Sequence, residues 1–369
     1  MKSYITLLTG ILISLSMFCQ AQEVGTLNGQ LNVAPNGAAV YSIQLDLPEG
    51  RGGMTPQIAL QYNSQAGDGV LGKGWGISGW SYVGREAETP YYEGLEEYQS
   101  KISRVDFMGD GFSIDGNRLI LVQQSTDKDY YRFELDNNTR VLHYNPSKAL
   151  DKNSKVQDIS YFEVQSPDGS IKIYGSSGSK QIYGANNPAI RYYLKRVVDL
   201  SGNIIEYNYD ISQETGELYL KEIIYSKDNE NISTSNTEYY KVKFNYTGII
   251  KQHSYTTFMP YNDEKYEYTV SKLLESITLS FYEAGSSSVV KQWKLEYLRG
   301  GLFGEINSNT GKNYLKQITL TDGNEKVLKP TVFEWTFNSS TDKYEKRLAY
   351  ETFEDVWWSN TPGQQFIQR

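Results

Sequence analysis

Residues 47–75 read LPEGRGGMTPQIALQYNSQAGDGVLGKGW, and this stretch constrains the backbone more strongly than any other part of the sequence. It is dense in glycine, holds two prolines, and carries almost no side chain of the kinds that perform catalysis. Glycine tolerates positive φ and lets two backbones approach each other closely. The stretch therefore specifies backbone shape, and it points to architecture before chemistry.

The N-terminus predicts an export signal. Lys2 supplies a positive charge, residues 5–18 form an apolar run, and small side chains at Cys19 and Ala21 suit cleavage after Ala21. The run is too short for a convincing membrane span. In a lipoprotein Cys19 would be the lipidated residue, but Phe18 stands where a small residue is expected. We expect an exported protein, either secreted and extracellular or held at the cell surface.

The cysteine count and the net charge limit the kinds of metal site and partner that the chain could have. Cys19 is the only cysteine, so the mature chain would contain no disulfide and no cysteine metal site. Removing the signal would leave 35 basic against 44 acidic residues, a net charge of −9. The sequence has no basic run, which argues against nucleic acid as a partner. No later segment is apolar enough to predict a membrane span.

The residue pattern predicts an all-β fold, a large antiparallel hairpin-rich sheet with few or no helices beyond the signal. The chain holds 31 tyrosines against 13 phenylalanines and 6 tryptophans, and tyrosine suits half-buried strands. Apolar and polar residues alternate over several runs, and turn signals such as Asp168-Gly169 separate them. The best helix candidate is residues 93–103. The alternating runs include residues 131–135, 240–246 and 292–297, and further turns lie at 115–117, 199–203 and 322–324.

A weak repeat runs through the second half. The four-residue pattern Leu-x-x-Ile/Val begins at Leu194, Leu220, Leu274 and Leu315, and tyrosine precedes the leucine in three of the four copies. The spacing is irregular, so a strict solenoid is excluded. Two interpretations remain open: hairpins that merely look alike, or a degenerate hairpin repeat that extends one long sheet.

For domain organisation, we expect a signal at residues 1–21 and one continuous β domain at residues 22–340. Residues 341–369, which include Trp357 and Trp358, would begin a connection to another domain.

The motifs that suggest a catalytic or ligand-binding site each lack a residue or a sequence context that such a site requires. Residues 67–73, GDGVLGK, have the spacing of a phosphate-binding loop, but Gly74 stands where Ser or Thr should hold magnesium. His143 and His253 are the only histidines and neither lies in a zinc or triad motif. Residues 106–111 resemble a calcium loop only faintly, because Met108 cannot donate oxygen.

Carboxylates give no stronger signal. The pairs Glu96-Glu97 and Asp263-Glu264 lie in polar surroundings typical of solvated surface. Glu86-Ala87-Glu88 matches the bare Glu-x-Glu of ADP-ribosyltransferases but lacks the preceding strand that the fold requires, so chance explains it better. We expect no catalytic, cofactor-binding or metal-binding residues, no cofactor, and no enzyme activity.

The opening stretch resembles a known family. Residues 41–75 with Ile77-Ser78-Gly79, residues 105–107 and 115–119, and the run PTVFEW at 330–335 are similar to the N-terminal SpvB/TcaC-type domain. This domain occurs in virulence plasmid B proteins and in the B components of insecticidal Tc toxin complexes, which are related to Rhs/YD-repeat proteins. The resemblance implies a wall segment of a hollow β-sheet shell of Rhs type that encloses a toxic domain of a partner chain. It also implies a β-propeller downstream, and it carries over no catalytic residue.

Three functions follow in order of preference. The first is a noncatalytic structural module of an exported toxin or virulence-type protein, contributing to a shell or scaffold that encloses or presents a toxic or surface polypeptide. Its partner would be another Rhs/toxin polypeptide, or a downstream β-propeller or Rhs segment. The second is an exported surface binding protein for glycans or host proteins, with Trp75, Trp80 or Trp357 as contact platforms. The third is an ADP-ribosyltransferase-type effector.

Overall fold

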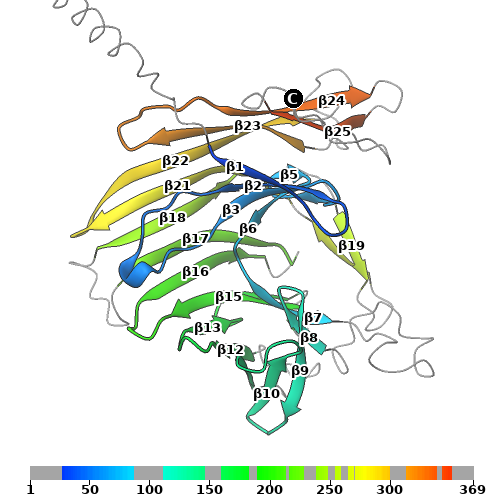
Figure 1. The fold of residues 1–369 in the computed structure, drawn as a ribbon, viewed down its shortest axis with the longest axis vertical. Coiled ribbons are helices and arrows are strands. Elements are labelled where there is room, and N and C mark those ends of the chain that lie inside the picture. Colours follow the sequence, from blue (N-terminus) through cyan, green and yellow to red (C-terminus); the bar gives the residue numbers. More distant parts are fainter. Residues whose placement is uncertain are drawn as a thin grey trace, which may run out of the picture.

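The computed structural model describes residues 27–86, 111–145, 159–182, 189–212, 216–227, 238–247, 254–258, 265–269, 271–299, 313–338 and 343–350 (Figure 1). Within these residues the secondary structure is β, apart from one 3-10 turn, η1, at Arg51–Gly53. The described strand pairings are antiparallel, from β1–β2 to β24–β25. The all-β, hairpin-rich fold class is therefore confirmed, while the helix expected at residues 93–103 lies outside the described residues.

The glycine-rich stretch helps to build a small sheet with the strand order β1-β2-β3-β6. Alternation decides its inner face, since Ala39, Tyr41 and Ile43 of β2 are buried between less buried neighbours. None of its four strands contains a charged residue, which suits a sheet packed against a large apolar surface. The strands are β1 (Gly29–Val33), β2 (Ala39–Gln44), β3 (Ala59–Asn63) and β6 (Trp75–Ser78), with the short hairpin β4 (Asp68–Gly69) and β5 (Gly72–Lys73) between the last two.

A closed barrel follows the small sheet in the chain. Its strands pair in sequence order and the last returns to β7 through β15. Phe112, Phe162 and Tyr192 fill the interior with edge-to-face contacts. The barrel strands are β7 (Tyr82–Glu86), β8 (Gly111–Ile114), β9 (Asn117–Gln123), β10 (Lys128–Phe133), β11 (Arg140–Tyr144), β12 (Tyr161–Gln165), β13 (Ile171–Tyr174) and β15 (Arg191–Val198), with β14 (Lys180–Gln181) also paired to β15.

β15 joins this barrel to a long sheet. Its first residues, from Arg191 to Tyr193, pair with β7, and its last, from Arg196 to Val198, pair with β16. From there neighbouring strands pair one after another to β25. The strands are β16 (Ile204–Ile211), β17 (Leu218–Lys227), β18 (Tyr239–Tyr246), β21 (Leu274–Glu283), β22 (Ser286–Arg299), β23 (Asn313–Asp322), β24 (Thr331–Asn338) and β25 (Lys343–Tyr350); β19 (Ser254–Phe258) and β20 (Lys265–Thr269) form a separate hairpin.

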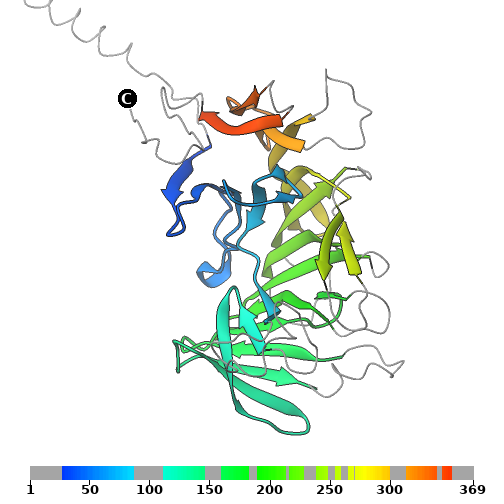
Figure 2. The same cartoon turned by 90° about the vertical axis from the view of Figure 1, so that its right-hand side faces the viewer.

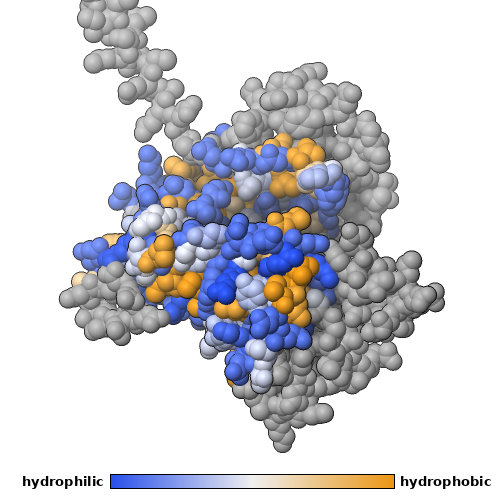
Figure 3. Space-filling view, turned by 60° about the horizontal axis from the view of Figure 1, so that its bottom comes forward, coloured by the Kyte–Doolittle hydropathy of each residue, from blue (hydrophilic) through white to orange (hydrophobic). Residues whose placement is uncertain are grey.

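The long sheet curves around the small sheet (Figure 2). One hydrophobic cluster connects them, and its aromatic centre includes Trp75 packed 4.8 Å from Phe333, ring centre to ring centre. Two layers of sheet around one core are a stable all-β solution. On the face shown in Figure 3, apolar residues lie in separate patches among hydrophilic ones. Among the residues described, no helix has the length and hydropathy needed to cross a membrane.

Candidate functional site

The four Leu-x-x-Ile/Val segments occupy equivalent places in the long sheet. Each begins a pair of neighbouring strands that we call a repeat hairpin: β15–β16, β17–β18, β21–β22 and β23–β24. The leucine is buried in every copy, with exposed fractions of 0% to 4%. The leucines are Leu194, Leu220, Leu274 and Leu315.

The backbone pairing of each repeat hairpin ends at the same point. The last pair formed on this side always involves the second residue after the leucine, so the two strands separate where the leucine lies. Separation leaves the leucine without a paired residue on the second strand of its own hairpin. These last pairs are Arg196–Glu206, Glu222–Lys243, Ser276–Lys294 and Gln317–Val332.

An aromatic side chain closes each separation. It stands three residues beyond the last paired residue of the second strand and donates a hydrogen bond to the leucine carbonyl oxygen. A buried carbonyl needs such a partner. We call these four side chains the aromatic locks: Tyr209 on Leu194 at 2.5 Å, Tyr246 on Leu220 at 2.8 Å, Tyr297 on Leu274 at 2.5 Å and Trp335 on Leu315 at 2.7 Å.

The locks are packed as well as hydrogen-bonded. Where a tyrosine precedes the leucine, its ring contacts the lock of the same hairpin, as in Tyr219 and Tyr246 with ring centres 5.1 Å apart. The same contact joins Tyr314 to Trp335 at 4.9 Å. Burial raises the pKa of the Tyr297 hydroxyl well above its usual value, so it stays a donor.

The tyrosine locks also lie at bulges that join one repeat hairpin to the next. Tyr209, Tyr246 and Tyr297 pair with the leucines of the following hairpins, directly after a shift in register. A bulge bends its strand and increases the local twist. A bulge repeated at one level of successive strands therefore curves the long sheet, which we call the wall.

The pattern of aromatic locks changes where the barrel begins. Tyr174 of β13 pairs with Leu194 beside the same kind of register shift. Its hydroxyl lies 3.0 Å from the hydroxyl of Ser81 and not on a leucine carbonyl. The backbone carbonyl oxygen of Ser81 accepts a hydrogen bond from the Leu194 backbone amide, at 2.9 Å. The repeat geometry thus gives way to β7 at the junction between barrel and long sheet.

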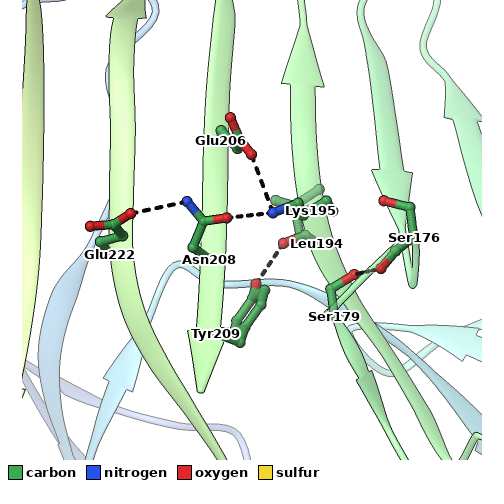
Figure 4. Close-up of polar contacts among 8 residues, drawn as sticks. All are labelled: Ser176, Ser179, Leu194, Lys195, Glu206, Asn208, Tyr209 and Glu222. Carbon is green, nitrogen blue, oxygen red and sulfur yellow. Dashed lines mark hydrogen bonds and ion pairs between the residues drawn. The ribbon is translucent and has the colours of Figure 1, made fainter. Parts of the chain in front are cut away.

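A polar network lies on the face of the first repeat hairpin opposite its aromatic lock (Figure 4). Lys195 forms an ion pair with Glu206 at 3.2 Å and donates a hydrogen bond to Asn208. The Asn208 amide donates to Glu222 at 3.3 Å, and Glu222 pairs with Lys241 at 3.3 Å. The outer face of the wall is therefore charge-balanced across four strands.

The glycine-rich stretch holds the wall by backbone contacts. The Leu274 amide donates to the Val70 carbonyl in the β4–β5 hairpin, at 2.8 Å. Gly72 has φ 83°, and a Cβ there would lie 2.5 Å from the carbonyl oxygen of Asn313. Only glycine fits such a position without displacement of the backbone.

The preceding loop straps the small sheet to the same wall. The Tyr225 hydroxyl donates to the Pro48 carbonyl at 3.1 Å, and Lys291 pairs with Asp46. Gly50 lies against the Tyr225 ring, where a Cβ would be 3.0 Å from the nearest ring atom. Residues far apart in the sequence are thereby joined into one unit.

The sequence motifs that suggested chemistry take structural roles where they are described. Residues 67–73 form the antiparallel β4–β5 hairpin, without the helix that a phosphate-binding loop requires. His143 is buried in the barrel and stacks on Phe162, with ring centres 4.0 Å apart. Glu86 ends β7 and accepts a hydrogen bond from Ser113.

The proposed contact platforms differ from each other. Trp75 is 2% exposed in the core and has no face to offer a ligand. Trp80 is half-buried and stacks on Tyr193 with ring centres 5.1 Å apart. The described residues contain no group of three or more His, Cys, Asp or Glu that could hold a metal. Glu88, Glu96, Glu97, His253, Asp263, Glu264, Trp357 and residues 106–110 lie outside the described residues.

The aromatic locks are not evident from the sequence. The leucine of each repeat hairpin can be recognised there but the lock cannot, because the intervening loops differ in length and no fixed spacing connects the two. The sequence does show that each lock lies in an alternating run of the second strand, but the point where backbone pairing ends is visible only in the structure.

Comparison with known proteins identifies the family and shows related folds. Residues 33–274 match the family model described as Salmonella virulence plasmid 65kDa B protein. A crystal structure of TcdB2-TccC3 is similar over 85% of the chain, with a TM-score of 0.61 and 17% identity. The N-terminal domain of effector protein SpvB from Salmonella typhimurium is similar over 76% of the chain and 98% of its own, with a TM-score of 0.51 and 14% identity.

A Tc holotoxin pore structure from Photorhabdus luminescens is similar over 86% of the chain, with a TM-score of 0.58 and 15% identity. The chain spans only 17% of the length of the Tc chains it matches. No curated protein matches it in sequence. The family match covers well over half of the chain, and the fold agrees with it, so the chain belongs to the SpvB family.

Proposed function

We propose that this chain is a noncatalytic structural module of an exported, toxin- or virulence-type protein, and that it contributes a wall segment to a β-sheet shell or scaffold. The shell would enclose or present a toxic or surface polypeptide. The observation that carries the proposal is the series of aromatic locks, which fasten four successive hairpins and, at the three tyrosines, lie at bulges that bend the sheet. Such repetition builds an extended curved surface, and each unit contacts its neighbours.

The partner follows from the same proposal. Another Rhs/toxin polypeptide, or a β-propeller or Rhs segment in the same assembly, would complete the enclosure. Residues 1–21 would direct export to the outside of the cell or its surface, and residues 22–340 would form the β domain. Residues 341–369 would lead toward a further domain, with the β24–β25 hairpin spanning that boundary.

Protease protection tests this function. The protein is co-expressed with a candidate Rhs/toxin-type polypeptide, purified, and digested under native conditions. We expect the two chains to copurify and the toxin-type polypeptide to resist digestion only when this chain is present. A monomeric chain that leaves the polypeptide fully sensitive would contradict the proposal.

A transferase assay tests the absence of enzyme activity. Purified protein is incubated with labelled NAD and cell lysate, beside a Glu88→Ala variant. We expect no label above background in either sample. Label that requires Glu88 would replace the structural proposal with an enzymatic one.

A further inference from the structure

The polar network of the first repeat hairpin brings together a reactive set of groups. Lys195 directly follows Leu194, and Asn208 directly precedes the lock Tyr209, so both lie where the two strands separate. The amine of Lys195 contacts the side-chain carbonyl oxygen of Asn208 (Figure 4). Glu206 lies 3.2 Å from that amine, and Glu222 accepts a hydrogen bond from the Asn208 amide nitrogen at 3.3 Å.

We propose that Lys195 and Asn208 join in an intramolecular isopeptide bond. The amine nitrogen of Lys195 attacks the side-chain carbonyl carbon of Asn208, the new C–N bond forms, and the original amide C–N bond breaks. The lysine nitrogen gives up two of its three protons, the departing nitrogen takes them, and ammonium leaves. No oxidant, metal or cofactor is required.

The two carboxylates have different roles in the reaction. Glu206 is placed to take a proton from the attacking amine, and Glu222 holds the Asn208 side chain in place by accepting a hydrogen bond from its amide nitrogen. The Lys195 and Glu206 side chains are only 18% and 24% exposed, which limits competition from water. Two strands of one sheet hold the nucleophile and the carbonyl together before the reaction. Little entropy therefore has to be lost to orient the two groups.

The position of the bond in the fold indicates which part of the structure it would stabilise. The β15–β16 ladder contains three backbone pairs, whereas the β21–β22 ladder contains eight. β15 also carries β7 along the same edge, so this hairpin joins the barrel to the long sheet. A covalent link at its separated end would stabilise this short ladder at the junction.

The second repeat hairpin offers a matched control. It has the same residue types at the equivalent positions, Lys221 after Leu220 and Asn245 before Tyr246. There Lys221 pairs with Asp210 at 3.3 Å, and Asn245 donates to Ser276 and Thr278. The geometry therefore assigns the bond to the first hairpin and not to the second.

Mass spectrometry of the full-length purified protein tests the bond. We expect a mass below the sequence value by about 17 Da, the mass of the ammonia lost. After digestion, fragment ions should show a branched peptide that joins Lys195 to Asn208. Lys195→Arg retains a cation for Glu206 but cannot form the amide. Both it and Asn208→Ala should show the mass calculated for the variant chain from its determined N-terminus, without the loss of ammonia.

Controls separate this reaction from others with the same mass change. Cyclisation of an N-terminal glutamine or ring closure at Asn-Gly also removes ammonia, but either would persist in Asn208→Ala. Asn245→Ala should keep the branched peptide. Wild-type protein without a Lys195–Asn208 branch, or a mass loss unchanged by both substitutions in the first hairpin, would overturn the proposal.

Discussion

Single glycines decide how closely the N-terminal stretch approaches the wall. At position 72 a positive φ and a neighbouring carbonyl act together, since a Cβ would lie 2.5 Å from Asn313 oxygen. At position 76, in β6 of the same stretch, a Cβ would meet nothing within 4 Å. Glycine is therefore required for a close contact at position 72, whereas at position 76 it is simply one residue of a strand.

Replacing Gly72 should weaken the protein more than replacing Gly76. We expect Gly72→Ala to lower the free energy of unfolding by about 1–3 kcal/mol, because the positive φ and the close carbonyl both penalise a side chain. Gly76→Ala should change it by less than about 0.5 kcal/mol. Urea unfolding followed by circular dichroism measures both, and equal effects would contradict the close approach.

Buried tyrosine makes stability depend on alkaline pH. Burial raises the pKa of Tyr62 to about 12 from 10.0, because desolvation disfavours the ionised phenolate. A raised pKa in the folded state means that the contribution is fully present below pH 10.0 and is lost as the pH rises toward 12. Burial likewise raises the pKa of Tyr207 and Tyr225.

Tyr62→Phe should reduce that alkaline loss. Between about pH 9 and pH 11 the wild type should lose more unfolding free energy than the variant, by on the order of 1 kcal/mol. Urea titrations at the two pH values give the difference. An identical decline in both proteins would show that Tyr62 does not contribute.

At the level of elements, the sequence predicted the strands better than their connections. Alternation in residues 240–246 and 292–297 predicted the parts of β18 and β22 that the structure contains. The Leu-x-x-Ile/Val pattern corresponds to a real structural repeat, because the same hydrogen bond recurs in each copy. The sharing of β15 between two neighbours could not be predicted, since it depends on tertiary contacts with β7 and β16.

The aromatic locks predict a specific effect of removing one hydroxyl. Tyr297→Phe keeps the ring but leaves the buried Leu274 carbonyl without its donor, so we expect a loss of about 1–3 kcal/mol. Tyr282→Phe is the control, because Tyr282 stacks on Tyr239 on a half-buried surface and should tolerate the change. Denaturant midpoints of the two variants provide the comparison, and a neutral Tyr297→Phe would remove the lock as a stabilising device.

At the scale of the whole molecule, the small sheet and the wall depend on each other. Trp75 contacts Phe333 of β24 at 4.8 Å and Tyr62 of β3 at 5.6 Å, so one side chain connects both layers. The sequence predicted that the glycine-rich stretch serves architecture. It could not show that β24 lies against this stretch, because more than 250 residues separate Trp75 from Phe333.

Trp75→Ala should therefore destabilise both layers together. We expect a loss of about 3–5 kcal/mol and a single unfolding transition, as for other large-to-small changes in a packed core. Val289→Ala is the control, because Val289 is 50% exposed. Two separate transitions in the wild-type protein, seen by circular dichroism, would contradict the mutual dependence.

The central claim is that the locked, curved sheet is a wall segment of an assembly. The test is electron cryo-microscopy of a complex purified after co-expression with a candidate Rhs/toxin-type polypeptide. We expect density for the long sheet in a continuous β-wall around an enclosed polypeptide. A complex in which this domain lies apart from any such wall would contradict the claim.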